Sequence, residues 1–149
     1  MLRRTRLERG GFFFGFYKVF PKVFPKAAIV KTDSTYAEMV KYVTNSFLAT
    51  KVSFANEMYQ ICNGLEVDYD KVIEYATYDE RLGKSHWSVP GPDGDLGYGG
   101  HCFPKDVKAL IDLSHDLNVR PRILTAVDCK NNDVRENRDW EGMKGRAII

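Results

Sequence analysis

The chain has 149 residues, a formal charge of +2 at pH 7 and 44% hydrophobic residues. This length suits about one domain with a sizeable core. A charge so close to neutral argues against nucleic acid or an anionic membrane as a partner. Three widely spaced cysteines argue against a disulfide framework and favour a reducing compartment, so we expect a cytoplasmic protein. No apolar run of about eighteen residues is present, so no transmembrane helix is expected.

The first thirty residues show little regular pattern. They combine a basic start, the aromatic run FFFGFYKVF and the tandem KVFPKVFPK, whose prolines are incompatible with a regular helix. Charged interruptions and the lack of a small-residue cleavage site argue against a signal peptide. We interpret this segment as a linker or remnant. The stretch AAIVK, residues 27–31, is predicted to be a short strand.

A long helix is predicted from Thr35 to Asn63. Thr35 with Glu38 resembles a capping box, Ser34 is the other candidate cap, and Asn63-Gly64 is a stop signal. Its apolar positions form two stripes, Tyr36, Val40, Val43, Phe47, Phe54, Met58 and Ile61 on one and Leu48, Val52, Ala55, Tyr59 and Cys62 on the other. Two stripes indicate two covered faces, and a second copy of the chain would help to cover them.

Three shorter helices are predicted after it. One begins at Asp68 (VDYDKVIEYAT), one runs over 104–117 and one over 121–134, the last two each starting at a proline. The long intervening loop RLGKSHWSVPGPDGDLGYGGH is of a length that is usually functional or disordered. The closing GMKGRAII has the pattern of a turn and the first half of a strand.

Several motifs fail on inspection. GKS at 83–85 lacks the earlier glycine and the preceding strand of a phosphate-binding loop, and the glycines from Gly97 lack the strand that leads into a dinucleotide fingerprint. The histidines share no ligand spacing with the cysteines, so no metal site is predicted and surface positions are expected for them. Cys62 and Cys129 are interpreted as buried structural thiols.

Cys102 differs from the other two cysteines. It precedes Pro104 and so lies at or near a helix start, where free N–H groups and the helix dipole stabilise a thiolate. Lys105 adds a positive charge, and Asp106 returns to the same face one turn later. Glycines before it allow close approach of a ligand. A nucleophilic cysteine needs this arrangement, although a helix start after a flexible loop would show the same pattern.

GYGGHCFPKD resembles the catalytic-cysteine signature of the UDP-glucose/GDP-mannose dehydrogenase family. STYAEMVKYVTNSFLATKVSFANE resembles the long central helix of that family, and DERLG, VPGPDG and NRDWEGMKGRAII resemble further segments, so the likeness covers roughly residues 27–149. It implies a mainly α fold, a long central helix with shorter packed helices. This would be the dimerisation domain of a three-domain α/β dehydrogenase, with short strand remnants at both ends.

The resemblance also implies roles for individual residues. Cys102 would be the nucleophile, Asp106 would activate water or support its neighbour, and Lys41 and Asn45 would stabilise the oxyanion. Substrate contacts are implied for Gly99, Gly100, Lys105 and, toward the partner subunit, Arg81. Lys41 and Asn45 are four residues apart, so one helical face can present both donors. Without the resemblance, Lys41 would be interpreted as a solvated helix lysine.

The implied reaction is the NAD-dependent oxidation of the C6 alcohol of a nucleotide sugar, UDP-glucose preferred, to a carboxylate. We expect three segments, namely a remnant of the NAD-binding domain (1–33), the central helical domain (34–138) and the truncated start of the nucleotide-sugar domain (139–149). The chain alone is expected to be inactive and to form a homodimer through the helix from Thr35 to Asn63. The alternatives are a non-catalytic helical dimerisation module and a cysteine hydrolase with His101 or His115 as base.

Overall fold

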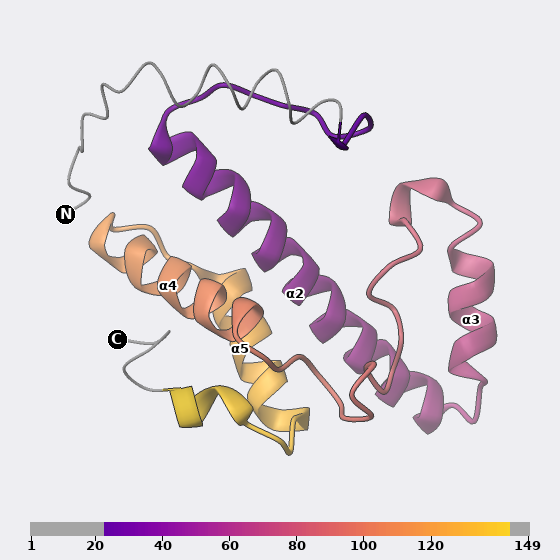
Figure 1. Ribbon diagram of the computed structural model, residues 1–149. Helices are drawn as coiled ribbons and strands as arrows, with labels where there is room; N and C mark the ends of the chain where they lie inside the picture. The colour runs from indigo at the N-terminus through magenta and orange to yellow at the C-terminus, as the bar shows by residue number, and fades with distance from the viewer. Residues whose placement is uncertain (1–22, 144–149) are drawn as a thin grey trace. The chain divides into compact units, whose positions relative to one another are not determined.

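The computed structural model describes residues 23–143 (Figure 1). The chain divides into two compact units, Met1–Tyr36 and Ala37–Ile149. The predicted strand at 27–31 does not form, because a strand needs a neighbour to pair with and residues 23–143 contain no other strand. The expected strand at the C-terminal end lies outside the described residues. The domain boundaries expected from the sequence stay a prediction.

The long helix is α2, Ser34–Gly64. Its start is capped by Asp33, whose carboxylate accepts a hydrogen bond from the N–H of Tyr36 at 3.1 Å, so the caps predicted at Thr35 or Ser34 are wrong. The helix ends as predicted at the Asn63-Gly64 stop. The left-handed residue after it is Glu66, with φ of 56°, rather than the glycine.

The shorter helices confirm the predictions to within two residues. Helix α3 covers Tyr69–Ala76 and is capped by Asp68. It is followed by the 3-10 helix η1, Glu80–Leu82, by α4, Cys102–Asp116, by α5, Arg122–Val134, and by the 3-10 helix η2, Asp139–Met143. Within residues 23–143 the protein is therefore entirely helical apart from its loops, as the mainly α expectation requires.

Two apolar clusters hold these helices in the second unit. The first joins α2, α4, α5 and the loop at residues 97–100, here called the glycine loop, through Ala49, Val107, Val127 and Tyr98. The second joins α2, α3 and the long loop through Ala55, Cys62, Tyr69 and Val89. Figure 1 shows α4 and α5 together beside α2, where α4 and α5 pack on each other, and α3 beside the C-terminal end of α2.

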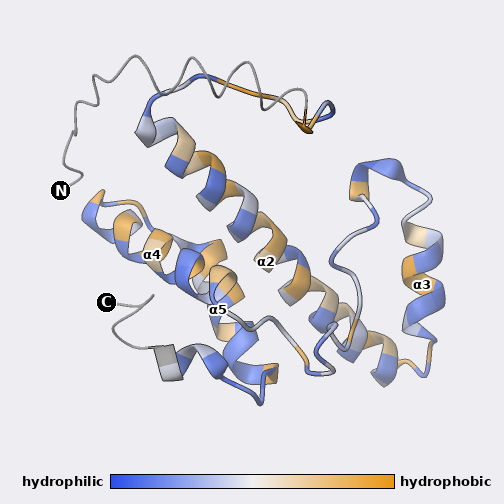
Figure 2. Cartoon of the chain, in the orientation of Figure 1, coloured by the Kyte–Doolittle hydropathy of each residue, from blue (hydrophilic) through white to orange (hydrophobic). Residues whose placement is uncertain are grey.

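The two predicted stripes of α2 have different surroundings. The stripe that contains Val52, Ala55 and Cys62 packs into the two clusters. The other stripe stays open, since Val40, Phe47 and Phe54 keep 64%, 67% and 51% of their surface exposed. Figure 2 shows hydrophobic residues recurring between hydrophilic ones along the length of α2. This chain alone therefore covers one of the two apolar faces predicted for α2.

Candidate active site

Four residues predicted from the sequence come together at the start of α4. Asp106 is fully buried, and its carboxylate accepts hydrogen bonds from Asn45 Nδ2 at 2.5 Å and from Lys105 Nζ at 2.6 Å. Lys41 Nζ lies 3.3 Å from each of its two oxygens. Lys41 and Asn45 come from one face of α2, as their spacing predicted.

The charges of this cluster are fixed by these contacts. Burial by itself would raise the pKa of the Asp106 carboxyl, but hydrogen bonds from Lys105, Asn45 and Lys41 outweigh burial and hold that pKa below its ordinary value. The hydrogen bond to Asp106 in turn raises the pKa of Lys105. At neutral pH Asp106 is therefore a carboxylate that faces the protonated Lys105.

Cys102 is the first residue of α4 and is exposed, with His101 in the N-cap position. Asp106 lies one turn further along the same helix, on the side of Cys102. His101 and His115 are exposed, as expected for surface histidines, and within residues 23–143 neither hydrogen-bonds to Cys102. Among the described residues, the cationic and amide donors thus contact Asp106, one turn from Cys102.

The other two cysteines are not alike. Cys62 is buried in the second cluster, as predicted. Cys129 is exposed, so its interpretation as a buried thiol is wrong. The reason is helical geometry, because α5 buries Val127 and Asn131 and a residue two positions from each points to the opposite side.

The loop before Cys102 is held by side chains from distant parts of the chain. The N–H of Gly97 donates to Asn56 Oδ1 at 3.1 Å, and the N–H of Tyr98 donates to Asn131 Oδ1 at 2.6 Å. Asn131 Nδ2 donates back to the carbonyl of Tyr98 at 3.0 Å. Asn56 comes from α2 and Asn131 from α5, so both long-range anchors are buried amide side chains.

The second half of the loop has its own anchors. The N–H of Gly100 donates to both carboxylate oxygens of Asp139 at 3.0 Å. The guanidinium of Arg135 occupies the space where a side chain at position 99 would begin, so a larger residue there would have to displace it. The sequence analysis missed these anchors. The Asn131 and Arg135 pair, four apart on one face of α5, was the available signal.

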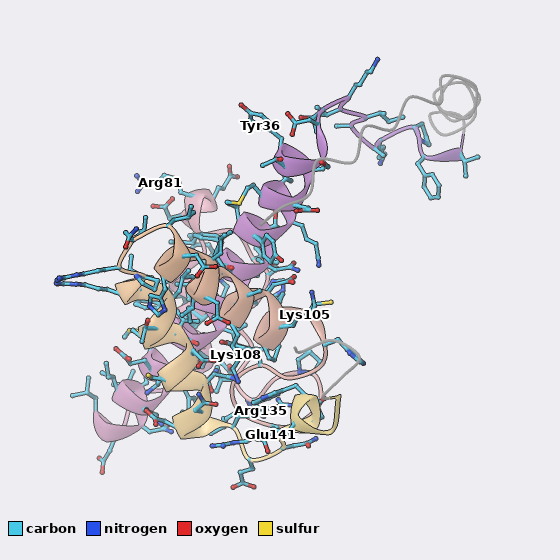
Figure 3. The ribbon with its side chains drawn as sticks, turned by 90° about the vertical axis from the view of Figure 1, so that its left-hand side faces the viewer. Tyr36, Arg81, Lys105, Lys108, Arg135 and Glu141 are labelled. Atoms are coloured by element: carbon cyan, nitrogen blue, oxygen red, sulfur yellow. The ribbon has the colours of Figure 1, made fainter. Side chains whose placement is uncertain are left out.

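Gly99 and Gly100 line a cavity of about 550 Å³ together with His86, Asp93 and Arg135. Gly100 has a φ of 72° and no atom near the position of a side chain, so its cavity side is open. Arg81 lies elsewhere. It is exposed on η1 and pairs with Asp79 at 2.5 Å, and Figure 3 shows it well separated from Lys105. The structure brings Arg81 to none of the other predicted residues.

The structure therefore places a buried carboxylate, held by a lysine and an amide from one long helix, one turn after an exposed cysteine. The comparisons with known proteins show the family of the chain. Residues 35–133 match the central domain of the UDP-glucose/GDP-mannose dehydrogenase family, and the chain belongs to that family.

The chain is similar to proteins named UDP-glucose 6-dehydrogenase. One, from Haloferax volcanii, is 37% identical over 78% of this chain and 28% of its own length, and another, from Pseudomonas aeruginosa, is 43% identical over 67% and 21%. A solved UDP-glucose dehydrogenase from Pyrobaculum islandicum superposes with a TM-score of 0.65 at 34% identity, covering 78% of this chain and 26% of that one. The chain thus spans about a quarter of the length of these relatives.

Proposed function

We propose that the chain is the cysteine-bearing central part of an NAD-dependent dehydrogenase that oxidises the C6 alcohol of UDP-glucose to the carboxylate. The names of its relatives support the substrate. The observation that carries the proposal is the contact of Lys41, Asn45 and Lys105 with the buried Asp106, one turn from the exposed Cys102. An exposed thiol with hydrogen-bond donors gathered one helical turn away is an arrangement that supports acyl chemistry.

In this proposal the Cys102 thiolate adds to the C6 carbonyl carbon of the aldehyde, and the carbonyl oxygen becomes an oxyanion. The ammonium of Lys41 and the amide of Asn45 are the donors for that charge, each worth about 2.7–4 kcal/mol in the transition state. Loss of a hydride then leaves a thioester on Cys102. Water adds to the acyl carbon, the C–S bond breaks, and the carboxylate, the free thiolate and protons are released.

Asp106 acts here by supporting its neighbours rather than by accepting a proton from water. Its pKa is held low and its oxygens accept three donors, which makes it a weak base. Its hydrogen bond raises the pKa of Lys105, and its oxygens set the positions of Lys41 and Asn45. Activation of water by Asp106 would instead require these contacts to open.

The described residues do not fit the nicotinamide dinucleotide that the resemblance implies. No strand leads into the glycine loop within residues 23–143, and the space above Gly97 and Gly99 is filled by Asn131 and Arg135 rather than left open for phosphates. NAD would accept the hydride in both oxidations. No step of the cofactor is assigned to these residues, so we propose that the chain alone reduces no NAD.

A homodimer through α2 is part of the proposal. Its open stripe exposes Val40, Val43, Phe47, Phe54 and Ile61, each with about half or more of its surface in water. An apolar face of this length on one helix is typical of an interaction surface. A second copy would offer the same face around a two-fold axis. Arg81, exposed on η1, is the residue that we propose to reach the substrate of the partner subunit.

The test combines this chain with the separately expressed flanking regions of the Pseudomonas aeruginosa relative and follows NADH formation from UDP-glucose and NAD. We expect two NADH per UDP-glucuronate, none with Cys102→Ser, and a loss of about 100- to 1,000-fold in kcat with Lys41→Ala. Lys71→Ala, an exposed lysine on α3, is the matched control and should change nothing. GDP-mannose in place of UDP-glucose tests the choice of sugar.

The alternative is a helical dimerisation module without chemistry. The open stripe of α2 is the observation in its favour. It predicts that the mixture forms dimers but yields no NADH, and that Cys102→Ser changes no measurable property. A mixture that forms dimers, yields no NADH and is unchanged by Cys102→Ser would replace the dehydrogenase proposal by this one.

A further inference from the structure

Arg135 is a buried cation at the C-terminal end of α5, with 1% of its side chain exposed. Its Nη2 lies 2.6 Å from Asp93 Oδ2, and its Nε lies 3.4 Å from Asp95 Oδ2. It also donates to the carbonyl of Leu96 at 3.4 Å and to that of Asn137 at 2.8 Å. One guanidinium therefore contacts both carboxylates and a carbonyl of the segment that leads into the glycine loop.

The same guanidinium also packs on the loop itself. A Cβ added to Gly99 would overlap its Nη2 and Cζ atoms. Gly99 is flanked by Tyr98 and Gly100, whose N–H groups are held by Asn131 and Asp139. Arg135 thus fills the gap between two anchored amides, and it does so through the planar shape of its side chain.

The carboxylates around Arg135 are charged at neutral pH. The hydrogen bond from Arg135 lowers the pKa of Asp93, and a backbone hydrogen bond from Asn137 lowers that of Asp95. A planar guanidinium can contact both while lying flat on a backbone, which the round ammonium of lysine cannot do. The site therefore depends on arginine in particular and not only on a positive charge.

We propose that Arg135 is a positioning residue that fixes the glycine loop and thereby the start of α4, where Cys102 lies. The proposal rests on the proposed function only in taking Cys102 as the catalytic thiol, because the geometry of the loop is independent of the reaction. Arg135 is two residues beyond the matched family segment, 35–133. It acts on the thiol through Gly99, and it touches neither Cys102 nor the Asp106 cluster.

The first experiment measures hydrogen exchange of backbone amides in the whole 149-residue chain, in the wild type and in Arg135→Lys. We expect the amides of Gly97, Tyr98 and Gly100 to exchange about tenfold faster in the variant, since the loop loses a charged anchor. Amides in the middle of α2 should keep their wild-type rates. Arg138→Lys is the matched control, because Arg138 is a half-exposed neighbour that pairs with Glu141 and touches no loop residue.

A second variant reaches the same contact without changing Arg135. Gly99→Ala places a methyl group where the guanidinium lies and should displace it, with the same acceleration of the three loop amides. Since both changes break one contact, the double variant should be no faster than about twofold beyond either single one. A sum of the two separate effects would show that Arg135 and Gly99 act independently, and would overturn the proposal.

The consequence for the thiol is measured with iodoacetamide, using the exposed Cys129 as internal reference. We expect the labelling rate of Cys102 relative to Cys129 to change at least about threefold in Arg135→Lys, because a loosened loop alters the access of the reagent to the thiol. An unchanged ratio, or loop amides that accelerate only together with those of α2, would reduce Arg135 to a residue of general stability. Neither measurement uses enzyme activity, so an inactive reconstituted enzyme would contradict the proposed function and leave this inference standing.

Discussion

Asn131 binds the backbone of Tyr98 on both sides, accepting from its N–H at 2.6 Å and donating to its carbonyl at 3.0 Å. Both residues are buried, so the two backbone groups have no access to water when the amide is removed. The side chain of Asn131 also occupies the space beside Gly97. One amide of α5 thus completes the hydrogen bonding of the loop.

Replacing Asn131 by alanine should destabilise the chain by about 2–3 kcal/mol, because it leaves a buried donor and a buried acceptor unpaired. Urea unfolding measures this loss. The control is Asn132→Ala, since the side chain of Asn132 is partly exposed and donates one 3.3 Å hydrogen bond, to Asp128. Equal losses for the two variants would mean that the two hydrogen bonds of Asn131 to Tyr98 contribute no more to stability than the exposed contact of Asn132.

The contribution of Asp106 should depend on pH. Its pKa is lower in the folded chain than in the unfolded chain, so the stabilisation is present above the unfolded value, near 3.8, and is lost as pH falls through the folded value. At pH 7 we expect Asp106→Asn to unfold more easily than the wild type by about 1–3 kcal/mol.

The wild type and Asp106→Asn are compared by urea unfolding at pH 7 and again well below the unfolded pKa. Other carboxylates with lowered pKa values, among them Asp93 and Asp95, titrate equally in both proteins, so the difference between the two isolates Asp106. That difference should shrink in acid. A gap of the same size at both pH values would show that the charge of Asp106 does not stabilise the fold.

The open stripe of α2 should control self-association. Phe47→Asp puts a charge in the middle of the exposed apolar face, and we expect the dimer measured by sedimentation to dissociate. The free energy of unfolding of the monomer should change by less than about 0.5 kcal/mol, because Phe47 is 67% exposed within one chain. Tyr75→Asp, an exposed position on α3, serves as the control. A dimer that survives Phe47→Asp places the interface elsewhere.

The three cysteines should react in an order set by exposure. Iodoacetamide is expected to modify Cys102 and Cys129 in the folded chain and Cys62 only after unfolding, since Cys62 lies on α2 and is buried in the second apolar cluster. Mass spectrometry of the peptides follows each site. Modification of Cys62 at the rate of Cys129 would contradict the packing of the second apolar cluster.

The helices were predictable because each has local signals. Asp68 caps α3, and a stop at Asn63-Gly64 ends α2. Pro104 lies in the first turn of α4, and Pro121 directly precedes α5. The face shared by Lys41 and Asn45 also follows from their spacing. The burial of Asp106 beneath them does not, because the contacts join residues 61 and 65 positions apart.

The predictions that were wrong or missing depend on contacts with other parts of the chain. The segment 27–31 has the composition of a strand but no partner strand in the described residues. Cys129 is apolar in character but lies on the side of α5 that the fold leaves exposed. The roles of Arg135 and Asp139 depend on the path of a loop forty residues earlier, which periodicity does not reveal.

The glycine loop depends on anchors that are far from it in the sequence, so it forms late in folding. Gly97 is held by a residue 41 positions before it, Tyr98 by one 33 positions after it and Gly100 by one 39 positions after it. Contacts of such separation form late, after the chain between them has closed. During synthesis Cys102 is therefore made well before Asn131 and Asp139, two of the three side chains that hold its loop, and it becomes an ordered thiol only once Asp139 has followed.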